Sequence, residues 1–348
     1  MIGHYPLGRL DAAPKVRITR MRDALDAICD LTFLSDTREG RRRPLLALMG
    51  RIREFDAVYV ESATSTATET DLLFHALCRR AGVPLGIYIR DVYPLYDFFY
   101  DASTLKNRIL RLAWHISMAR YRRDASVLFF PTQGMADHFA HPKKRLLPPA
   151  GHLVEGLDRT HVEPRVIYAG GVIKQYGIDT LLEAMDLVVA QVPQAALTLV
   201  CPEGRQPLLD PWRDRRWLEI KHLPADALLP EMNRAMIAAL PIQPTDYPSI
   251  SVKLFDYLSY GLPVVATPWK EVKRFIDAHG CGAIAEANPP AFAAELIRLL
   301  THPDEAAKLG QASLDAIRNG NTWDDRARTL LDALLDRDAT PATSALTR

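Results

Sequence analysis

Cysteine is scarce in this sequence and is never clustered. The 348 residues contain four cysteines, Cys29, Cys78, Cys201 and Cys281, and none of them belongs to a C-x-x-C pair. Neither a zinc site nor a disulfide framework is therefore indicated, and a reducing cytoplasm is the expected compartment. The ten histidines also lack the H-x-x-x-H and H-E-x-x-H spacings. We consequently expect no metal site and no cofactor.

Long hydrophobic runs and a signal-peptide pattern are missing as well. No run of about 18 uncharged apolar residues occurs, so the sequence predicts no membrane span. The net charge of +1 is small but hides an asymmetry. Residues 1–150 carry 23 lysines and arginines against 16 acidic residues (+7), whereas the remainder carries 20 against 26 (−6). Two explanations stay open: ordinary variation between two domains, or a basic half that faces an anionic membrane surface or an anionic lipid-linked acceptor.

What the sequence does contain is a regular alternation of short apolar runs and longer amphipathic stretches. In the first half, three runs predict buried strands, at 55–62, 83–91 and 125–132, and two stretches predict helices, at 67–81 and 104–123. In the second half, six runs predict strands, at 165–171, 195–202, 217–223, 236–242, 263–268 and 282–287. Helical patterns such as 176–192 and 289–303 lie between them. This alternation is typical of parallel sheets with helices on both faces.

The length suggests two domains, and the segment 142–164, rich in proline, glycine and charge, separates the two sets of strands. We expect the following division: an N-terminal domain over 1–150, a linker over 151–164, a C-terminal domain over 165–320, a helix over 321–336 and a flexible tail over 337–348. The opening "MIGHYPLG" begins where a first strand should be ending, so this strand is either unusually short or starts upstream. Sheets of this kind bind ligands at the carboxyl ends of their strands, and two of them predict a cleft between the domains.

Three segments of the second half occur in the order found in a known family. They are "VIYAGGVIKQYGIDTLLEAM" (166–185), "SVKLFDYLSYGLPVVAT" (251–267) and "GNTWDDRARTLLDALL" (320–335). They resemble the opening strand, glycine turn and helix, the acidic helix with its G-x-P-V-V-A strand, and the closing helix of the retaining family 4 glycosyltransferases (the group 1 domain). "IRDVYP" (89–94) resembles a stretch of the subgroup that makes bacterial surface polysaccharides. The resemblance implies an α/β GT-B fold, in which two Rossmann-like, doubly wound parallel-sheet domains face each other across a cleft and the last helix crosses back.

The helix expected at 251–260 begins with hydroxyl and ammonium groups. Ser249, Ser251 and Lys253 lie at its start, where unpaired N–H groups and a partial positive charge favour phosphate oxygens. These side chains can hold the diphosphate of a nucleotide sugar, and Lys253 can stabilise the charge of the leaving diphosphate. The alternative is a helix cap at Ser249 and a solvated lysine. Asp256 stands where the resemblance places a glutamate that accepts hydrogen bonds from the ribose hydroxyls; an ordinary exposed acid is the alternative.

The chain departs from the family pattern at three positions. Pro248 replaces the first glutamate of the family's E-x7-E pair, and Gly171 and Tyr176 replace an arginine and a lysine that reach the diphosphate. Lys174 lies between the last two positions and is our candidate to supply the missing charge. Adjacent glycines still permit close approach of the backbone to a phosphate. The remaining candidate donor-binding residues are Gly170, Gly171, His222 and Glu271.

Arg90 and Asp91 follow an apolar strand of the first half and would lie at its carboxyl end. There Asp91 can position an acceptor hydroxyl, and Arg90 can approach phosphates or an anionic acceptor; an Arg–Asp pair that braces the loop is the alternative. An aromatic cluster follows and is suited to stacking on sugars, to contact with lipid or to a core: Tyr93, Tyr96, Phe98, Phe99 and Tyr100.

The helix expected over 105–123 is basic and amphipathic. Its cations are Lys106, Arg108, Arg111, Arg120, Arg122 and Arg123, and its apolar stripe consists of Leu105, Ile109, Leu112, Ile116 and Ala119. Such a stripe either docks on a membrane surface or packs against the sheet of its own domain and leaves the charges in water.

Together these patterns predict an enzyme of the hexosyltransferase type. It would move a sugar, without a metal, from a nucleotide diphosphate sugar to a glycan or lipid-linked acceptor of the exopolysaccharide or lipopolysaccharide kind. The resemblance implies retention of configuration. We expect the cytoplasm, free or at the inner face of the membrane, and no nucleic-acid partner. Two alternatives remain: a non-catalytic scaffold of a polysaccharide assembly complex, which need not bind a nucleotide, and an inverting GT-B transferase, which the product anomer would reveal.

Overall fold

The computed structural model describes the chain apart from residues 9–12, 65, 99–102, 205, 225–226 and 337–348. The described residues form two compact units. Unit 1 contains Met1–Pro149, Tyr247–Ser249 and the C-terminal helix from Trp323, and unit 2 contains Ala150–Asp246 and Ile250–Thr322. The tail expected over 337–348, together with Phe99 and Tyr100 of the aromatic cluster, lies outside the described residues.

Unit 1 is built on a six-stranded parallel sheet with the order β2-β1-β3-β4-β5-β6. Its strands are β1 (Ile2–Gly3), β2 (Leu34–Ser35), β3 (Val58–Glu61), β4 (Leu85–Tyr88), β5 (Val127–Phe130) and β6 (Lys144–Leu146). The strands predicted at 55–62, 83–91 and 125–132 are confirmed as β3, β4 and β5, and every residue in them is buried. The edge strands β2 and β6 were not predicted from the sequence, because they have only two and three residues and contain no apolar run.

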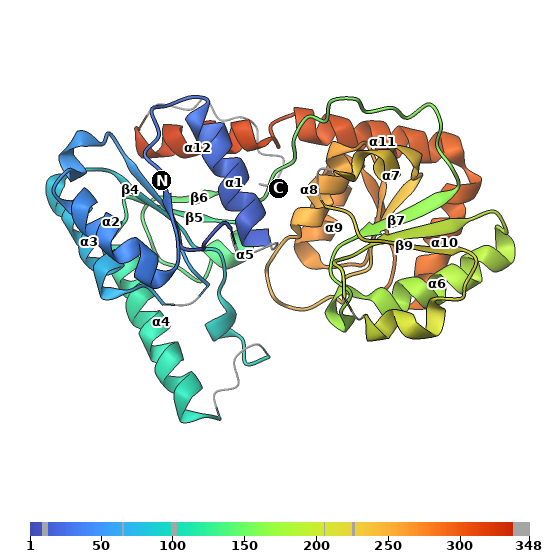
Figure 1. Cartoon of the computed structure of the whole chain (residues 1–348), viewed down its shortest axis with the longest axis horizontal. Helices are drawn as coiled ribbons and strands as arrows, with labels where there is room; N and C mark the ends of the chain where they lie inside the picture. The colour runs from blue at the N-terminus through green and yellow to red at the C-terminus, as the bar shows by residue number, and fades with distance from the viewer. Residues whose placement is uncertain (9–12, 65, 99–102, 205, 225–226, 337–348) are drawn as a thin grey trace. The chain divides into compact units, whose positions relative to one another are not determined.

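Helices of unit 1 pack in two groups (Figure 1). One group contains α1 (Ala13–Asp26) and α12 (Trp323–Leu334), and the other contains α2 (Arg38–Met49), α3 (Glu69–Ala81) and α4 (Leu105–Asp124). The short helix α5 (Gln133–Ala136) follows β5. Local sequence explains the ends of α3: Thr68 and Asp71 form a reciprocal capping box at its start, and Gly82 ends it in the left-handed conformation with φ 74°.

Unit 2 contains a second six-stranded parallel sheet, with the order β12-β11-β10-β7-β8-β9. Its strands are β7 (Arg165–Ala169), β8 (Ala196–Val200), β9 (Leu218–Lys221), β10 (Ile237–Leu240), β11 (Val264–Ala266) and β12 (Gly282–Ile284). All six strands predicted in the second half are thus confirmed. The helices are α6 (Ile178–Gln191), α7 (Leu229–Arg234), α8 (Val252–Ser259), α9 (Lys270–His279), α10 (Pro289–Thr301) and α11 (Pro303–Arg318).

Alternation along the strands of unit 2 sends side chains to two separate cores. In β7, Val166 and Tyr168 belong to the core that is shared with α6 and α10, whereas Ile167 belongs to the core that is shared with α8 and α9. This period of two is what a sheet covered on both faces requires. The expected fold class, parallel sheets with helices on both faces, is therefore confirmed in each unit.

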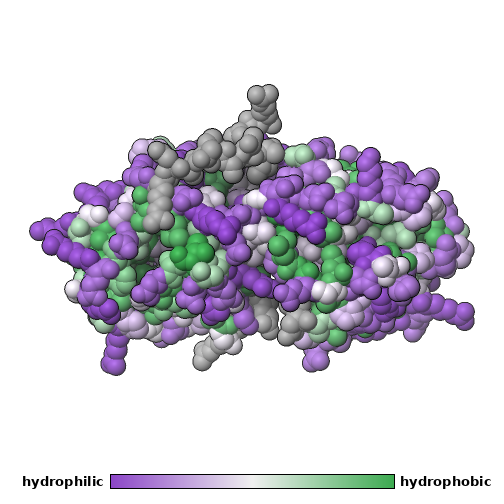
Figure 2. Space-filling model, turned by 90° about the horizontal axis from the view of Figure 1, so that it is seen from above, coloured by the Kyte–Doolittle hydropathy of each residue, from purple (hydrophilic) through white to green (hydrophobic). Residues whose placement is uncertain are grey.

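Most of the surface drawn in Figure 2 is hydrophilic, with apolar residues confined to separate patches. None of the described helices combines the length and hydrophobicity that crossing a bilayer requires.

Candidate functional site

The strand order of unit 2 changes direction between β7 and β10. The chain proceeds from β7 to β8 and β9 on one side, and β10, β11 and β12 extend the sheet on the other. Open parallel sheets bind ligands at the carboxyl ends of the strands beside such a switch point. At this edge, Gly170 follows β7, and the segment after β10 leads to the start of α8, which carries Lys253.

Lys253 lies in the first turn of α8, with its ammonium over aromatic rings. Its Nζ atom is 3.9 Å from the centroid of the Tyr176 ring and 5.8 Å from that of the Tyr168 ring. Burial lowers the pKa of Lys253 from 10.5 to about 8, against a smaller raising effect of the Asp256 charge. A lysine held in this way is not a solvated surface lysine, which was the structural alternative considered for this position.

Gly170 leaves the space that Lys253 occupies. A Cβ atom at this position would collide with Cε of Lys253, and the φ of 151° also favours glycine. The N–H of Gly170 donates to the carbonyl of Val200 at 2.8 Å, and the carbonyl of Gly171 accepts from the Tyr168 hydroxyl at 2.7 Å. The first glycine therefore admits the lysine side chain rather than presenting its own N–H to a ligand.

The N-terminal end of α8 offers further polar groups. Ser251 is the N-cap residue, and its hydroxyl makes no capping hydrogen bond. Asp256 is half-buried one turn beyond Lys253. Ser249 groups with unit 1, so the expected set of Ser249, Ser251 and Lys253 is divided between the two units.

Three other candidates from the sequence lie at different places in unit 2. Lys174 is exposed in a single 3-10 turn, Lys174–Tyr176, which follows β7. Glu271 is buried in the first turn of α9, after β11. His222 is exposed after the edge strand β9, where its Nδ1 atom lies 2.9 Å from the Cys201 carbonyl. Since β8 separates β9 from β7, His222 lies away from the switch point.

Tyr168 and Tyr257 were not among the residues predicted for the site. Tyr257 is fully buried in α8, and its hydroxyl accepts from the backbone N–H of Ala169 at 2.9 Å. This bond links α8, which carries Lys253, to the end of β7, which leads into Gly170. Nothing but the position of Tyr257 within the motif pointed to this function, since a buried tyrosine in a helix is usually part of the core.

In unit 1, Arg90 and Asp91 follow β4, and each has a different partner. Nη2 of Arg90 pairs with Oε2 of Glu61 at 2.9 Å. Asp91 accepts from the Thr64 hydroxyl at 2.7 Å and from the Tyr247 hydroxyl at 3.2 Å. Burial raises the pKa of Asp91, and these hydrogen bonds oppose that rise.

Glu61 is the centre of this cluster and was missed in the sequence analysis. It is fully buried at the end of β3 and pairs with both Arg17 and Arg90, each at 2.9 Å. The Tyr59 hydroxyl donates a third bond at 2.6 Å. A glutamate at the carboxyl end of an otherwise apolar strand was the available signal. The cluster holds Arg90 in place at the carboxyl edge of the unit 1 sheet.

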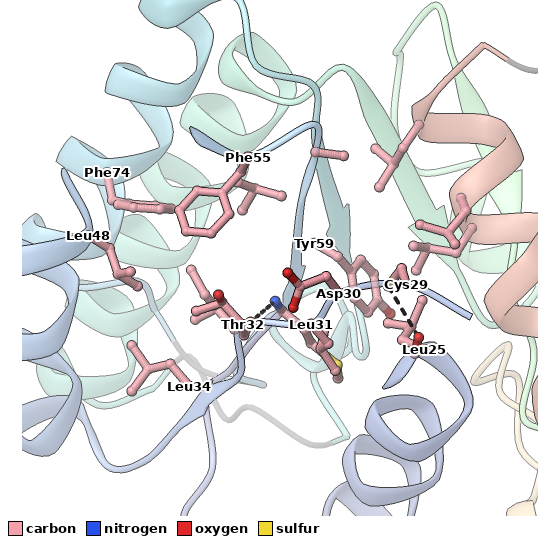
Figure 3. A pocket seen from close by; sticks show the side chains of 17 residues that line it. Leu25, Cys29, Asp30, Leu31, Thr32, Leu34, Leu48, Phe55, Tyr59 and Phe74 are labelled. Atoms are coloured by element: carbon pink, nitrogen blue, oxygen red, sulfur yellow. Dashed lines mark hydrogen bonds between the residues drawn. The ribbon is translucent and has the colours of Figure 1, made fainter. Parts of the chain in front are cut away.

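A separate apolar pocket of about 90 Å³ lies at the amino ends of strands of the unit 1 sheet (Figure 3). Its lining includes Leu34, Leu48 and Phe74 on one side and Leu25 on the other. The N-terminal ammonium donates to the Thr32 carbonyl at 2.7 Å at its wall. Because the pocket is at the amino ends of the strands and contains few polar groups, it differs from the two polar clusters described above.

No group of three or more histidine, cysteine, aspartate or glutamate side chains in the described part of the chain is arranged to hold a metal ion.

Comparisons with known proteins concern the family of unit 2 and the fold of the chain. Residues 163–302 match the family described as "Glycosyl transferases group 1", which covers most of unit 2 with its switch point. No curated protein matches the sequence.

Solved structures share the fold over nearly the whole chain. WaaG, a glycosyltransferase involved in lipopolysaccharide biosynthesis, is 14% identical, with coverage of 96% of this chain and 98% of that one and a TM-score of 0.66. HepE of Anabaena, in complex with UDP, is 12% identical, with coverage of 96% and 99% and a TM-score of 0.68. Sucrose-phosphate synthase of Thermosynechococcus elongatus is 15% identical, with coverage of 94% and 96% and a TM-score of 0.64. At these identities the likeness concerns the fold, and the expected GT-B fold is confirmed.

Proposed function

Since the chain has the GT-B fold and its residues 163–302 match the glycosyl transferases group 1 family, we propose that it transfers a sugar from a nucleotide diphosphate sugar, bound by unit 2, to a glycan or lipid-linked acceptor. The reaction is of the hexosyltransferase type, retains the anomeric configuration and needs no metal. The pathway is the synthesis of a bacterial surface polysaccharide. Retention and pathway follow from the motif resemblance, and the donor site follows from the residues below.

The observation that carries this proposal is the position of Lys253. A half-buried ammonium lies at the N-terminal end of α8, beside the switch point, in space that Gly170 leaves open. Burial disfavours its charge, as the lowered pKa indicates. At neutral pH most of the lysine is still charged, and an anionic ligand would stabilise this ammonium in place of the water that burial removes.

The same end of α8 supplies other groups suited to phosphate. The first backbone N–H groups of a helix lack intrahelical acceptors, and the partial positive charge there favours anions. The Ser251 hydroxyl makes no capping bond and can donate to a phosphate oxygen. Lys174 and the backbone N–H of Gly171 approach from the turn after β7 and are proposed as the second side of the diphosphate site.

In glycosyl transfer, the oxygen of the acceptor hydroxyl bonds to the anomeric carbon while the bond from that carbon to the diphosphate oxygen breaks. The hydroxyl proton passes to the leaving diphosphate, on which negative charge develops as the bond breaks. Lys253 and the helix end stabilise that charge in the transition state, and removal of one such group in other enzymes costs roughly 10²–10³ in rate. Asp256 accepts hydrogen bonds from the ribose hydroxyls. Arg90 and Asp91 of unit 1 are proposed for the acceptor, because Glu61 holds the first and Thr64 orients the second.

The test is a binding screen with the full chain, followed by variants. Thermal shift with UDP, GDP, ADP and dTDP, each beside its monophosphate, should identify one diphosphate that stabilises the protein more than its monophosphate. A ligand at about 100 times its Kd adds roughly 2.7 kcal/mol. Lys253→Met should abolish the preference for the diphosphate and lower turnover about 10²-fold or more, whereas Lys308→Met, at an exposed lysine of α11, should change neither.

The proposed donor site would be contradicted if none of these nucleotides bound, or if the Lys253→Met variant kept the preference for the diphosphate over the monophosphate.

A second candidate, a GT-B scaffold without catalytic activity, is favoured by one observation. Tyr176 stands where the family resemblance expects a lysine, and its ring lies over Lys253 instead of adding a second charge. Such a protein could bind a nucleotide without turnover. Hydrolysis or transfer of the bound nucleotide sugar by the pure protein separates the two functions.

A further inference from the structure

Helix α4 differs from an ordinary surface helix because it has an exposed apolar stripe in addition to its buried face. The buried face consists of Trp114, Ser117, Met118, Tyr121 and Asp124. The apolar stripe seen in the sequence lies elsewhere: Leu105, Ile109, Leu112 and Ile116 are 71%, 57%, 62% and 52% exposed. The stripe therefore does not pack against the sheet of its own unit, which was one of the two explanations considered for it.

Helical geometry explains this separation. At about 100° per residue, the four stripe residues fall within an arc of about 60°, and the centre of the buried face lies about 150° away. A helix on a globular domain normally has one apolar stripe, and that stripe faces the core. In α4 the second stripe has the same spacing of three and four residues but faces outward. Ala119, also exposed, extends it by one further turn.

Cations border the stripe. Lys106 and Arg108 are exposed about 90° to one side of its centre and about 70° to the other. Arg120 and Arg123 lie at its C-terminal end and pair with Asp124. Asp124 is the only acidic residue among the 20 residues of α4, and it is buried. The helix thus presents apolar side chains between positive charges without an exposed carboxylate of its own.

We infer that α4 docks unit 1 on the surface of a membrane that contains anionic lipids. Leu105, Ile109, Leu112 and Ile116 would enter the boundary between headgroups and acyl chains, and Lys106 and Arg108 would meet the lipid phosphates on either side. Charge complementarity selects this occupant, because an apolar stripe alone would suit a protein partner or a second copy equally well. The N-terminal half of α4 also extends beyond the sheet and the other helices of its unit (Figure 1), so that a flat surface can reach it.

The inference is tested by cosedimentation of the full chain with vesicles. Binding is expected to vesicles of phosphatidylglycerol and phosphatidylcholine in equal parts, but not to phosphatidylcholine alone, and it should weaken as salt rises. Each basic residue near such a surface contributes roughly fivefold to binding. Lys106→Glu with Arg108→Glu should therefore lower the partition coefficient about 25-fold or more. Ile109→Ser with Leu112→Ser should lower it by about tenfold or more, because less apolar surface enters the lipid.

Matched controls exist in the same unit. Arg42→Glu with Arg43→Glu, on α2, changes the net charge equally, and both side chains are exposed. Leu46→Ser with Leu73→Ser removes two leucines that are each 50% exposed on α2 and α3. Both control pairs should retain binding. Since all substituted residues are exposed, far-ultraviolet circular dichroism and the unfolding midpoint should stay unchanged.

Three outcomes would overturn the inference. The parent protein could ignore anionic vesicles at low salt, in which case the basic charge of the first half has another cause, such as an anionic acceptor near Arg90. The Ile109→Ser, Leu112→Ser variant could bind as tightly as the parent. Sedimentation velocity could reveal a dimer that the same variant dissociates, which would make a second copy the occupant of the stripe.

Discussion

The lowered pKa of Lys253 should make donor binding depend on pH in a range where an ordinary lysine would have no effect. Burial brings this pKa to about 8 in the ligand-free protein, and only the ammonium form attracts a diphosphate. With that value, the charged fraction falls from about 0.9 at pH 7 to about 0.1 at pH 9. The affinity for the nucleoside diphosphate should therefore fall about tenfold between these two pH values.

The assay is isothermal titration calorimetry of the parent and two variants at pH 7, 8 and 9. Lys253→Arg keeps its charge throughout this range, so its affinity should be flat whatever its absolute value. Lys253→Met should bind weakly and also independently of pH. A parent affinity that is constant from pH 7 to pH 9 would refute the reasoning, because binding of the diphosphate would then not depend on the protonation of Lys253.

The free energy of unfolding should also depend on pH through Lys253. The pKa of Lys253 is lower in the folded than in the unfolded protein, so unfolding takes up a proton between pH 8 and about 10.5, and this lysine makes the free energy of unfolding rise with pH in that window.

Three further predictions concern other parts of the molecule. Asp256→Asn keeps the size of the side chain but removes its charge, and it should weaken diphosphate nucleotide binding by about 1–3 kcal/mol in calorimetry; equal affinity would move the ribose contact elsewhere. Glu61→Gln should lower the free energy of unfolding by about 3–5 kcal/mol, because it leaves the buried Arg17 and the half-buried Arg90 without their carboxylate, whereas Glu54→Gln, at an exposed pair, should have little effect. Transfer activity should survive prolonged treatment with EDTA, and loss of activity that added divalent cations restore would show that a metal is needed.

The alternation of strands and helices was readable from the sequence because long, buried elements have clear periodicity. All six strands of unit 2 and β3, β4 and β5 of unit 1 were predicted for this reason. The edge strands β2 and β6 were not predicted, since two or three residues without burial on both faces produce no hydrophobic pattern in the sequence. Periodicity also could not say which way the stripe of α4 faces: the buried face contains Ser117 and Asp124, and it looks no more apolar than the exposed one.

The candidate site was predicted as residue types rather than as a set of contacts. The position of Lys253 followed from a motif, but its burial between Tyr176 and Gly170 depends on side chains that come together only in the fold. The partner of Arg90 could not be predicted either, because Glu61 lies 29 residues away and on another strand. Spacing in the sequence predicts which residues share a strand end or a helix turn, whereas contacts across strands depend on the strand order.

The central claim, that Lys253 and the start of α8 bind the diphosphate of a nucleotide sugar, is tested most directly by a crystal structure with the nucleoside diphosphate selected by the binding screen. We predict a phosphate oxygen within about 3.2 Å of Nζ of Lys253, a typical hydrogen-bond distance, with the helix end directed at the same group. A nucleotide bound elsewhere, with the Lys253 ammonium still over the Tyr176 ring, would contradict the account.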